Sequence, residues 1–191
     1  METGIEQEPG SGPSGWNVVL VEPEIPPNTG SVARLCAGCG GVLHLVEPLG
    51  FSLDDRYLKR AGLDYWDAVR LCVHPSFAAY LEAAQPDRLW LYGARAPRLY
   101  SAVSYQPGDH LVFGSESKGL PTSLLEQFAA QTLRLPILPA VRSYNLANSV
   151  AIALFEAIRQ QGWDPGPHPG GYLPGKPTVP WRHRRGNAER G

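Results

Sequence analysis

The sequence lacks a long apolar run, an export signal and a set of paired cysteines. No stretch is long enough to span a bilayer, and the first residues contain no basic start followed by an apolar segment. The three cysteines are an odd number, which argues against a disulfide scaffold and fits a reducing compartment. These absences exclude membrane-spanning and disulfide-stapled proteins, so we expect a soluble, cytoplasmic protein with no membrane partner.

The chain also has no surplus of charge of one sign. Its 17 basic and 18 acidic residues leave a formal net charge of −1. A strongly basic protein would attract nucleic acid through its overall field. If this chain binds RNA, the contacts must therefore come from local basic patches.

A complete metal signature is missing too. Cys36 and Cys39 form a single C-x-x-C pair, without a second cysteine pair or a nearby histidine to complete a zinc site. A redox role stays open on spacing alone. The same spacing places both side chains on one face of a helix, which favours two core residues, and we expect no metal.

Three common enzyme fingerprints are missing as well. Residues 38–41 lack the later glycine of the G-x-G-x-x-G pattern. Residues 114–119 have neither the spacing of a Walker A loop nor the G-x-S-x-G turn of a hydrolase. The sequence therefore disfavours a dinucleotide-dependent dehydrogenase, a P-loop NTPase and an esterase.

What the chain does contain is an alternation of short β-rich runs and helical patterns. We expect strands at residues 17–21, 42–46, 69–73, 88–92, 110–113 and 132–135, and helices at 29–39, 76–84, 122–129 and 146–161. This alternation predicts an α/β fold with a mainly parallel sheet flanked by helices. In such a fold the ligand lies beyond the carboxyl ends of the strands.

Both ends differ in composition from this middle part. Residues 1–15 consist mostly of Gly, Pro, Ser and Glu, and residues 163–191 are rich in Pro and Gly and carry a basic stretch. Such compositions are typical of linkers and tails. We expect a disordered N-terminal arm, one domain over residues 16–162 and a basic C-terminal tail.

Three segments carry more polar residues and glycines than a plain α/β domain needs. In the first, Asn28 is a natural N-cap for the helix that follows two prolines. Gly30, Arg34 and Gly38 share one face of that helix, which indicates close approach of a second backbone or a ligand. The alternative is that Arg34 is simply an exposed arginine.

The second segment joins an expected strand to an expected helix. Gly114 and Gly119 bound a tight polar loop, and Pro121 stands where a helix begins. Glycines at both ends let backbone N–H groups face a ligand. The pattern favours a functional loop over an ordinary connection between strand and helix.

The third segment, residues 142–149, enters the last expected helix. Asn145 suffices as a cap, so the other polar side chains around it, such as Ser143 and Tyr144, indicate a ligand site. Residues 150–155 are apolar nearly all round. Such a helix is either deeply buried or shared with another subunit.

Taken in this order and spacing, the three segments resemble the SPOUT superfamily of RNA methyltransferases, in particular its tRNA (cytidine/uridine-34) 2′-O-methyltransferase subfamily. The resemblance runs from residue 17 to about residue 163 and includes residues 59–66 and 101–105. It implies an α/β domain with a deep trefoil knot near the C-terminus, a homodimer, and S-adenosyl-L-methionine as cofactor. It also implies a tRNA anticodon arm as substrate, methylated on the ribose of nucleotide 34.

The resemblance carries over to individual residues. The positions matching the family's cofactor contacts and their neighbours are Tyr92, Gly93, Gly114, Leu135, Ser143 and Tyr144. Those matching its catalytic motifs are Asn28, Arg34 and Glu116. We expect RNA phosphate contacts from Arg142 and Lys118, and weaker candidates are Arg95, Arg98, Lys59 and Arg60.

The implied reaction is attack of a ribose 2′-hydroxyl on an activated methyl group, which requires positioning and removal of a proton. Arg34 is a poor general base because a guanidinium stays protonated, so we expect it to orient the ribose or a phosphate. Glu116 is either a proton acceptor or a residue that fixes its loop. Methylation of another tRNA or ribosomal RNA ribose, and RNA binding without catalysis, remain alternatives.

Four positions depart from the family pattern. Phe155 stands where a tyrosine is common, so that hydroxyl is absent. Ser115 replaces a proline, and Ser117 with Lys118 replaces Thr-Arg, which keeps the charge but loses a bidentate fork. These changes affect the expected substrate choice more than the cofactor site.

Overall fold

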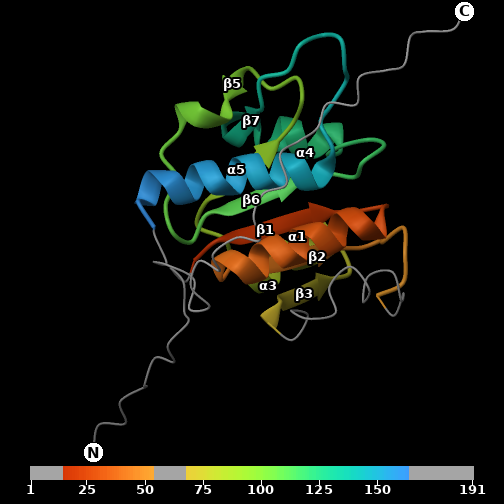
Figure 1. The fold of residues 1–191 in the computed structure, drawn as a ribbon. Helices are drawn as coiled ribbons and strands as arrows, with labels where there is room; N and C mark the ends of the chain where they lie inside the picture. Colours follow the sequence, from red (N-terminus) through yellow and green to blue (C-terminus); the bar gives the residue numbers. More distant parts are fainter. Residues whose placement is uncertain (1–14, 54–67, 164–191) are drawn as a thin grey trace, which may run out of the picture.

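The computed structural model describes residues 15–53 and 68–163 (Figure 1). The predictions made for residues 1–14 and 164–191, for residues 59–66, and for Lys59 and Arg60 as RNA contacts lie outside these ranges.

A seven-stranded parallel sheet forms the centre of the described part. Its strands are β1 (Asn17–Val21), β2 (Val42–Val46), β3 (Arg70–His74), β4 (Leu89–Tyr92), β5 (Arg98–Leu99), β6 (His110–Phe113) and β7 (Thr132–Arg134). The order across the sheet is β3-β2-β1-β6-β4-β7-β5, and all pairings are parallel. The predicted parallel α/β fold is confirmed, while the two-residue strand β5 was not predicted.

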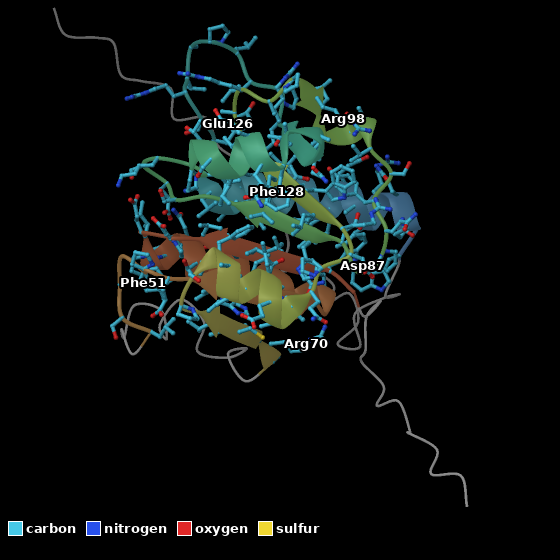
Figure 2. All side chains as sticks on the ribbon, turned by 180° about the vertical axis from the view of Figure 1, so that it is seen from behind. Phe51, Arg70, Asp87, Arg98, Glu126 and Phe128 are labelled. Atoms are coloured by element: carbon cyan, nitrogen blue, oxygen red, sulfur yellow. The ribbon has the colours of Figure 1, made fainter. Side chains whose placement is uncertain are left out.

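Helices cover both faces of this sheet. Helix α1 (Pro26–Cys39) and helix α5 (Leu146–Gln161) lie side by side on one face (Figure 1). Helix α3 (Phe77–Ala84) and helix α4 (Thr122–Gln127) lie on the opposite face (Figure 2). Short 3₁₀ turns follow β5 at Tyr100–Ala102 and precede β7 at Ala129–Gln131. The four expected helices are therefore confirmed, with ends shifted by up to three residues.

The inner strands β1, β4 and β6, together with β2, bury both of their faces, which explains their nearly continuous apolar runs. The edge strands β3 and β5 are mostly exposed within the described residues. Along β1, Val18 and Leu20 pack in the core on the α1 and α5 side, while Val19 and Val21 pack on the α3 and α4 side. The same alternation places Leu133 of β7 in the first core. Side-chain direction along each strand is thus fixed by its residue number.

The start of α1 differs from the prediction. The helix begins at Pro26, its N-cap residue is Ile25, and Ile25 provides no side-chain cap. Asn28 lies within the first turn, so the predicted role of Asn28 as N-cap is wrong. The physical reason is that Pro26 and Pro27 fit the first helical positions, where their fixed φ is favourable and their missing N–H is not needed.

Helices α1 and α5 confirm part of the expected burial. Cys36 and Cys39 are buried core residues, and burial raises the pKa of both thiols, so they are not reactive thiolates. On α5, Val150 and Leu154 are buried, but Phe155 is 51% exposed. The described part of the chain therefore leaves one side of α5 uncovered.

Three histidines lie buried together beside α3. The Nδ1 of His44 lies 3.0 Å from Nε2 of His74, and its Nε2 lies 3.2 Å from Oδ1 of Asn17. The hydroxyl of Tyr80 and Nδ1 of His110 share a hydrogen bond of 2.6 Å. Burial lowers the pKa of His44 and His110 to about 4, so the rings are neutral at pH 7.

No helix among the described residues is long and apolar enough to cross a membrane. Within the same residues, no group of three or more His, Cys, Asp or Glu side chains is arranged to hold a metal ion. The trefoil knot implied by the resemblance stays a prediction.

Candidate functional site

A cavity of about 1030 Å³ lies at the carboxyl ends of β4, β6 and β7. Its walls come from the residues after these strands, from the start of α5 and from one side of α4. A cavity of this size lies at the upper end of the range of small-molecule and cofactor sites. Its position at the carboxyl ends of the parallel strands is the one expected from the sequence.

Most of the predicted site residues line this cavity. They are Asn28, Tyr92, Gly93, Gly114, Glu116, Lys118, Leu135, Arg142, Ser143 and Tyr144. Arg34 is the exception: it lies exposed on α1 and is not among the lining residues. Close approach of another backbone was also expected along its face, but within the described residues a Cβ at Gly38 would meet nothing within 4 Å.

The loop after β6 folds back on itself tightly. Ser115 and Gly119 form an antiparallel bridge, and the N–H of Gly119 donates to the Ser115 carbonyl over 2.9 Å. A Cβ at Gly114 would collide with the backbone of Gly119 and Leu120. Gly119 itself has a φ of +71°, which favours glycine. Both glycines of the predicted functional loop are therefore required by its geometry.

Glu116 connects this loop to the start of α1. Its carboxylate accepts hydrogen bonds from the backbone N–H of Glu24 (2.8 Å), the backbone N–H of Ile25 (3.3 Å) and Nδ2 of Asn28 (2.9 Å). The carboxylate thus takes the place of the missing side-chain cap at the positive end of α1. These three donors favour the loop-fixing role for Glu116 over that of proton acceptor.

Asn28 continues the connection to the third segment. Its Oδ1 accepts a hydrogen bond from Nδ2 of Asn145 over 2.8 Å, while Oδ1 of Asn145 accepts from the N–H of Asn148 over 3.2 Å. Asn145 therefore caps α5, as predicted, and also bonds to α1. Glu116, Asn28 and Asn145 form one chain of hydrogen bonds that joins all three segments.

Glu24 gives the loop a second attachment that the sequence did not reveal. The backbone N–H of Ser117 donates to its Oε2 over 3.0 Å, and the Ser117 hydroxyl donates to its Oε1 over 2.6 Å. Glu116 of the loop thus bonds to the start of α1, while Glu24, just before α1, bonds to the loop. Glu24 stands between two prolines, and nothing in the local pattern marked it as a partner of Ser117.

An aromatic pair forms one wall of the cavity. The rings of Tyr92 and Phe113 are stacked, with centroids 4.4 Å apart and planes 10° apart. The hydroxyl of Tyr105 donates to the Tyr100 carbonyl over 2.7 Å, so the Tyr92 hydroxyl donates to Tyr105 over 2.8 Å. Burial raises the pKa of Tyr92 and brings that of Tyr105 to about 12, which keeps both hydroxyls protonated.

The loop before α5 closes the opposite side. Ser143 and Tyr144 are exposed within the described part, and the Tyr144 hydroxyl donates to the Pro136 carbonyl over 2.9 Å. Arg142 and Lys118 are exposed at the cavity as well. The cavity thus combines an apolar wall, backbone polar groups and cations.

The sequence pattern of the SpoU rRNA Methylase family matches residues 15–155. The chain belongs to this family. Its seven-stranded parallel sheet is therefore that of a SpoU methylase domain.

Curated relatives of this SpoU methylase chain carry a more specific name. It is 50% identical over 148 residues to a tRNA (cytidine(34)-2′-O)-methyltransferase of Escherichia coli K12, covering 77% of this chain and 94% of that protein. It is 49% identical over 154 residues to the enzyme of the same name in Burkholderia pseudomallei, covering 79% and 99%.

Solved structures agree with the fold. One, described as giving structural insights into the 2-OH methylation of C/U34 on tRNA, has a TM-score of 0.75 and 47% identity, covering 79% of this chain and 99% of that one. A putative RNA methyltransferase from Bacillus anthracis has a TM-score of 0.74 and 41% identity, covering 84% and 99%. The matched region thus covers almost the full length of each of these two solved structures.

Proposed function

We propose that this chain transfers a methyl group from S-adenosyl-L-methionine to the ribose 2′-hydroxyl of nucleotide 34 of tRNA, a cytidine or a modified uridine. The observation that carries the proposal is the convergence of the three sequence segments on one cavity, joined by Glu116, Asn28 and Asn145. Relatives that are about half identical bear the name of this reaction.

The cavity fits the proposed cofactor. Tyr92, Phe113 and Leu135 supply an apolar wall suited to an adenosine. Gly114 lines the same cavity and lets the 114–119 loop fold tightly beside this wall. Ser143 adds a hydroxyl next to the same wall. When bound, S-adenosyl-L-methionine supplies a methyl group that is already activated, and the proposed reaction requires no metal.

The protein's own contribution is then to position the ribose and stabilise its developing charge. We assign Arg34 to the ribose or its neighbouring phosphate, since a guanidinium remains protonated and can donate two parallel hydrogen bonds. Glu116 and Asn28 hold the loops rather than the reacting atoms. In this scheme, a group other than Glu116 accepts the proton of the ribose 2′-hydroxyl.

A homodimer would explain two exposed features together. Ile152 and Phe155 are 40% and 51% exposed on α5, and Arg34 lies exposed on the neighbouring α1. Exposed apolar side chains on one helix are typical of subunit interfaces. We propose that a second copy covers this surface and brings Arg34 into a complete site.

The proposed RNA contacts are Arg142 and Lys118 at the edge of the cavity. The proposed substrate, an anticodon arm, is a compact stem-loop that a protein can recognise by its shape and phosphates. The family description names ribosomal RNA, which keeps a ribosomal ribose as the second candidate substrate. We place the protein in the cytoplasm, where its free cysteines would stay reduced.

The decisive experiment is mass spectrometry of tRNA nucleosides from a strain that lacks the gene. We expect 2′-O-methylation at nucleotide 34 to disappear and to return with the wild-type gene. Unchanged methylation at that position would contradict the proposed substrate. A loss confined to ribosomal RNA would favour the second candidate.

Arg34→Lys tests the proposed role of the guanidinium. Lysine keeps the charge and loses the bidentate fork, so we expect kcat with purified tRNA to fall at least about tenfold while S-adenosylhomocysteine binds as in the wild type. Calorimetry and single-turnover methyl transfer measure the two quantities. Full activity in Arg34→Lys would remove the fork geometry from the mechanism.

A further inference from the structure

Arg134 ends β7 and lines the cavity in a half-buried position. Two residues earlier, the Thr132 hydroxyl donates to the carbonyl of Phe128, at the end of α4, over 3.0 Å. Because side chains alternate along a strand, Arg134 lies on the same face of the sheet as Thr132. Its guanidinium therefore belongs to the α4 side of the cavity, away from the aromatic wall.

Among residues 15–53 and 68–163, the guanidinium of Arg134 forms no ion pair. In the described part of the chain, no hydrogen bond or ion pair under 4.0 Å joins it to another residue. Two carboxylates line the cavity: Glu116 is engaged by three donors, and Glu126 is exposed and forms no ion pair within the described ranges. A half-buried, unpaired guanidinium is costly unless a ligand supplies the anion.

A second cation stands on the same wall. The N–H of Gly93 donates to the Leu133 carbonyl over 2.9 Å, which holds the loop after β4 against the end of β7. A Cβ at Gly93 would lie 3.2 Å from Leu125 of α4, so loop, strand and helix form one surface. Arg95 follows on this loop and also lines the cavity.

We propose that Arg134, assisted by Arg95, binds an oxyanion on the α4 side of the cavity. The proposal rests on the proposed function, which offers two sources of this chemistry: the carboxylate of the cofactor's methionine part and a phosphate of the RNA. A guanidinium matches both through two parallel N–H···O bonds. Together with Lys118 and Arg142, four cations surround the cavity against two carboxylates, a surplus that suits anionic ligands.

Calorimetry on the full-length protein tests the carboxylate source. Arg134→Met removes the charge and keeps most of the length, and Arg70→Met is the matched control, because Arg70 lies exposed on β3 at the opposite edge of the sheet (Figure 2). If the carboxylate binds here, Arg134→Met weakens S-adenosylhomocysteine at least about tenfold. The affinity for 5′-methylthioadenosine, which lacks the carboxylate, then stays unchanged.

The salt dependence of tRNA binding tests the phosphate source. If a phosphate binds here, Arg134→Met leaves S-adenosylhomocysteine binding unchanged and lowers the slope of log K against log salt by roughly 0.7. Arg134→Lys keeps the charge, so it retains most of this slope and serves as the folded reference. Arg95→Met is expected to give a smaller change of the same kind.

Two outcomes would overturn the proposal. In one, Arg134→Met matches Arg70→Met in both cofactor affinity and salt slope. In the other, S-adenosylhomocysteine and 5′-methylthioadenosine weaken equally, which indicates lost packing. Absence of methyl transfer by the wild type would instead contradict the proposed function. The binding measurements would still show whether Arg134 binds an oxyanion.

Discussion

Glu116→Gln distinguishes a carboxylate that holds a loop from one that accepts a proton. In the wild type, one oxygen accepts from the N–H of Glu24 and the other from Ile25 and Asn28. A glutamine has one oxygen and one NH₂ group, and the NH₂ group cannot accept. Whichever way the amide turns, at least one of these donors faces another donor instead of an acceptor.

The magnitude follows from the bonds that are lost. A hydrogen bond to a charged group contributes about 1.5–3 kcal/mol, and these bonds are only partly buried, so we expect about 2 kcal/mol of lost stability. For a domain of this size that lowers Tm by about 4–8 °C. The affinity for S-adenosylhomocysteine falls as well, because the loop that Glu116 holds forms part of the cavity.

Differential scanning calorimetry and cofactor titration measure both effects. Glu126→Gln is the matched control, since Glu126 lines the same cavity and its carboxylate forms no hydrogen bond or ion pair within the described residues. We expect its Tm to stay within about 1 °C of the wild type. A Glu116→Gln variant with wild-type Tm and a kcat reduced about 100-fold or more would refute the loop-fixing role and make Glu116 the proton acceptor.

Three further predictions concern stability and assembly. Burial lowers the pKa of His44 and His110 from 6.5 to about 4, so the unfolded state binds more protons in this window. In urea unfolding, the free energy of unfolding should fall by at most about 3 kcal/mol per ring as the pH is lowered from 6.5 to 4. A variant with both His44→Gln and His110→Gln should show a smaller fall. Gly114→Ala should cost about 1–3 kcal/mol in urea unfolding and weaken cofactor binding, because its Cβ meets backbone; wild-type stability would contradict this. Phe155→Glu should yield monomers in sedimentation at micromolar concentration, whereas Leu138→Glu, exposed outside α5, should not.

The fold was predictable from the sequence because the central strands are buried on both faces. The runs at Asn17–Val21 and His110–Phe113 are continuous apolar and β-branched or aromatic segments, and both were placed at their observed bounds. Strand β5 was not predicted because it has only two residues, Arg98 and Leu99, which are too few to show the alternation of side chains that indicates a strand. It forms only because β7 offers a free edge beside them.

The site was predictable to a lesser degree, since its residues meet across long stretches of chain. Asn28 and Glu116 are 88 residues apart, and Asn28 and Asn145 are 117 apart. The resemblance identified these segments as partners, but the bonds between them are a property of the fold. Local signals described Asn145 correctly as a cap and misassigned Asn28, because the prolines before Asn28 start the helix earlier.

The same bonds couple the cofactor loop to the proposed catalytic arginine. Glu116 holds the first turn of α1, and Arg34 follows Asn28 by six residues on the same helix, about 9 Å along its axis. A helix of this length moves as a rigid unit, so a shift of the 114–119 loop displaces Arg34 together with the helix start. We therefore expect the position of Arg34 to depend on how the cavity is filled, although Arg34 does not line it. A loosened Glu116 should lower the rate of methyl transfer through Arg34 even where the cofactor is saturating.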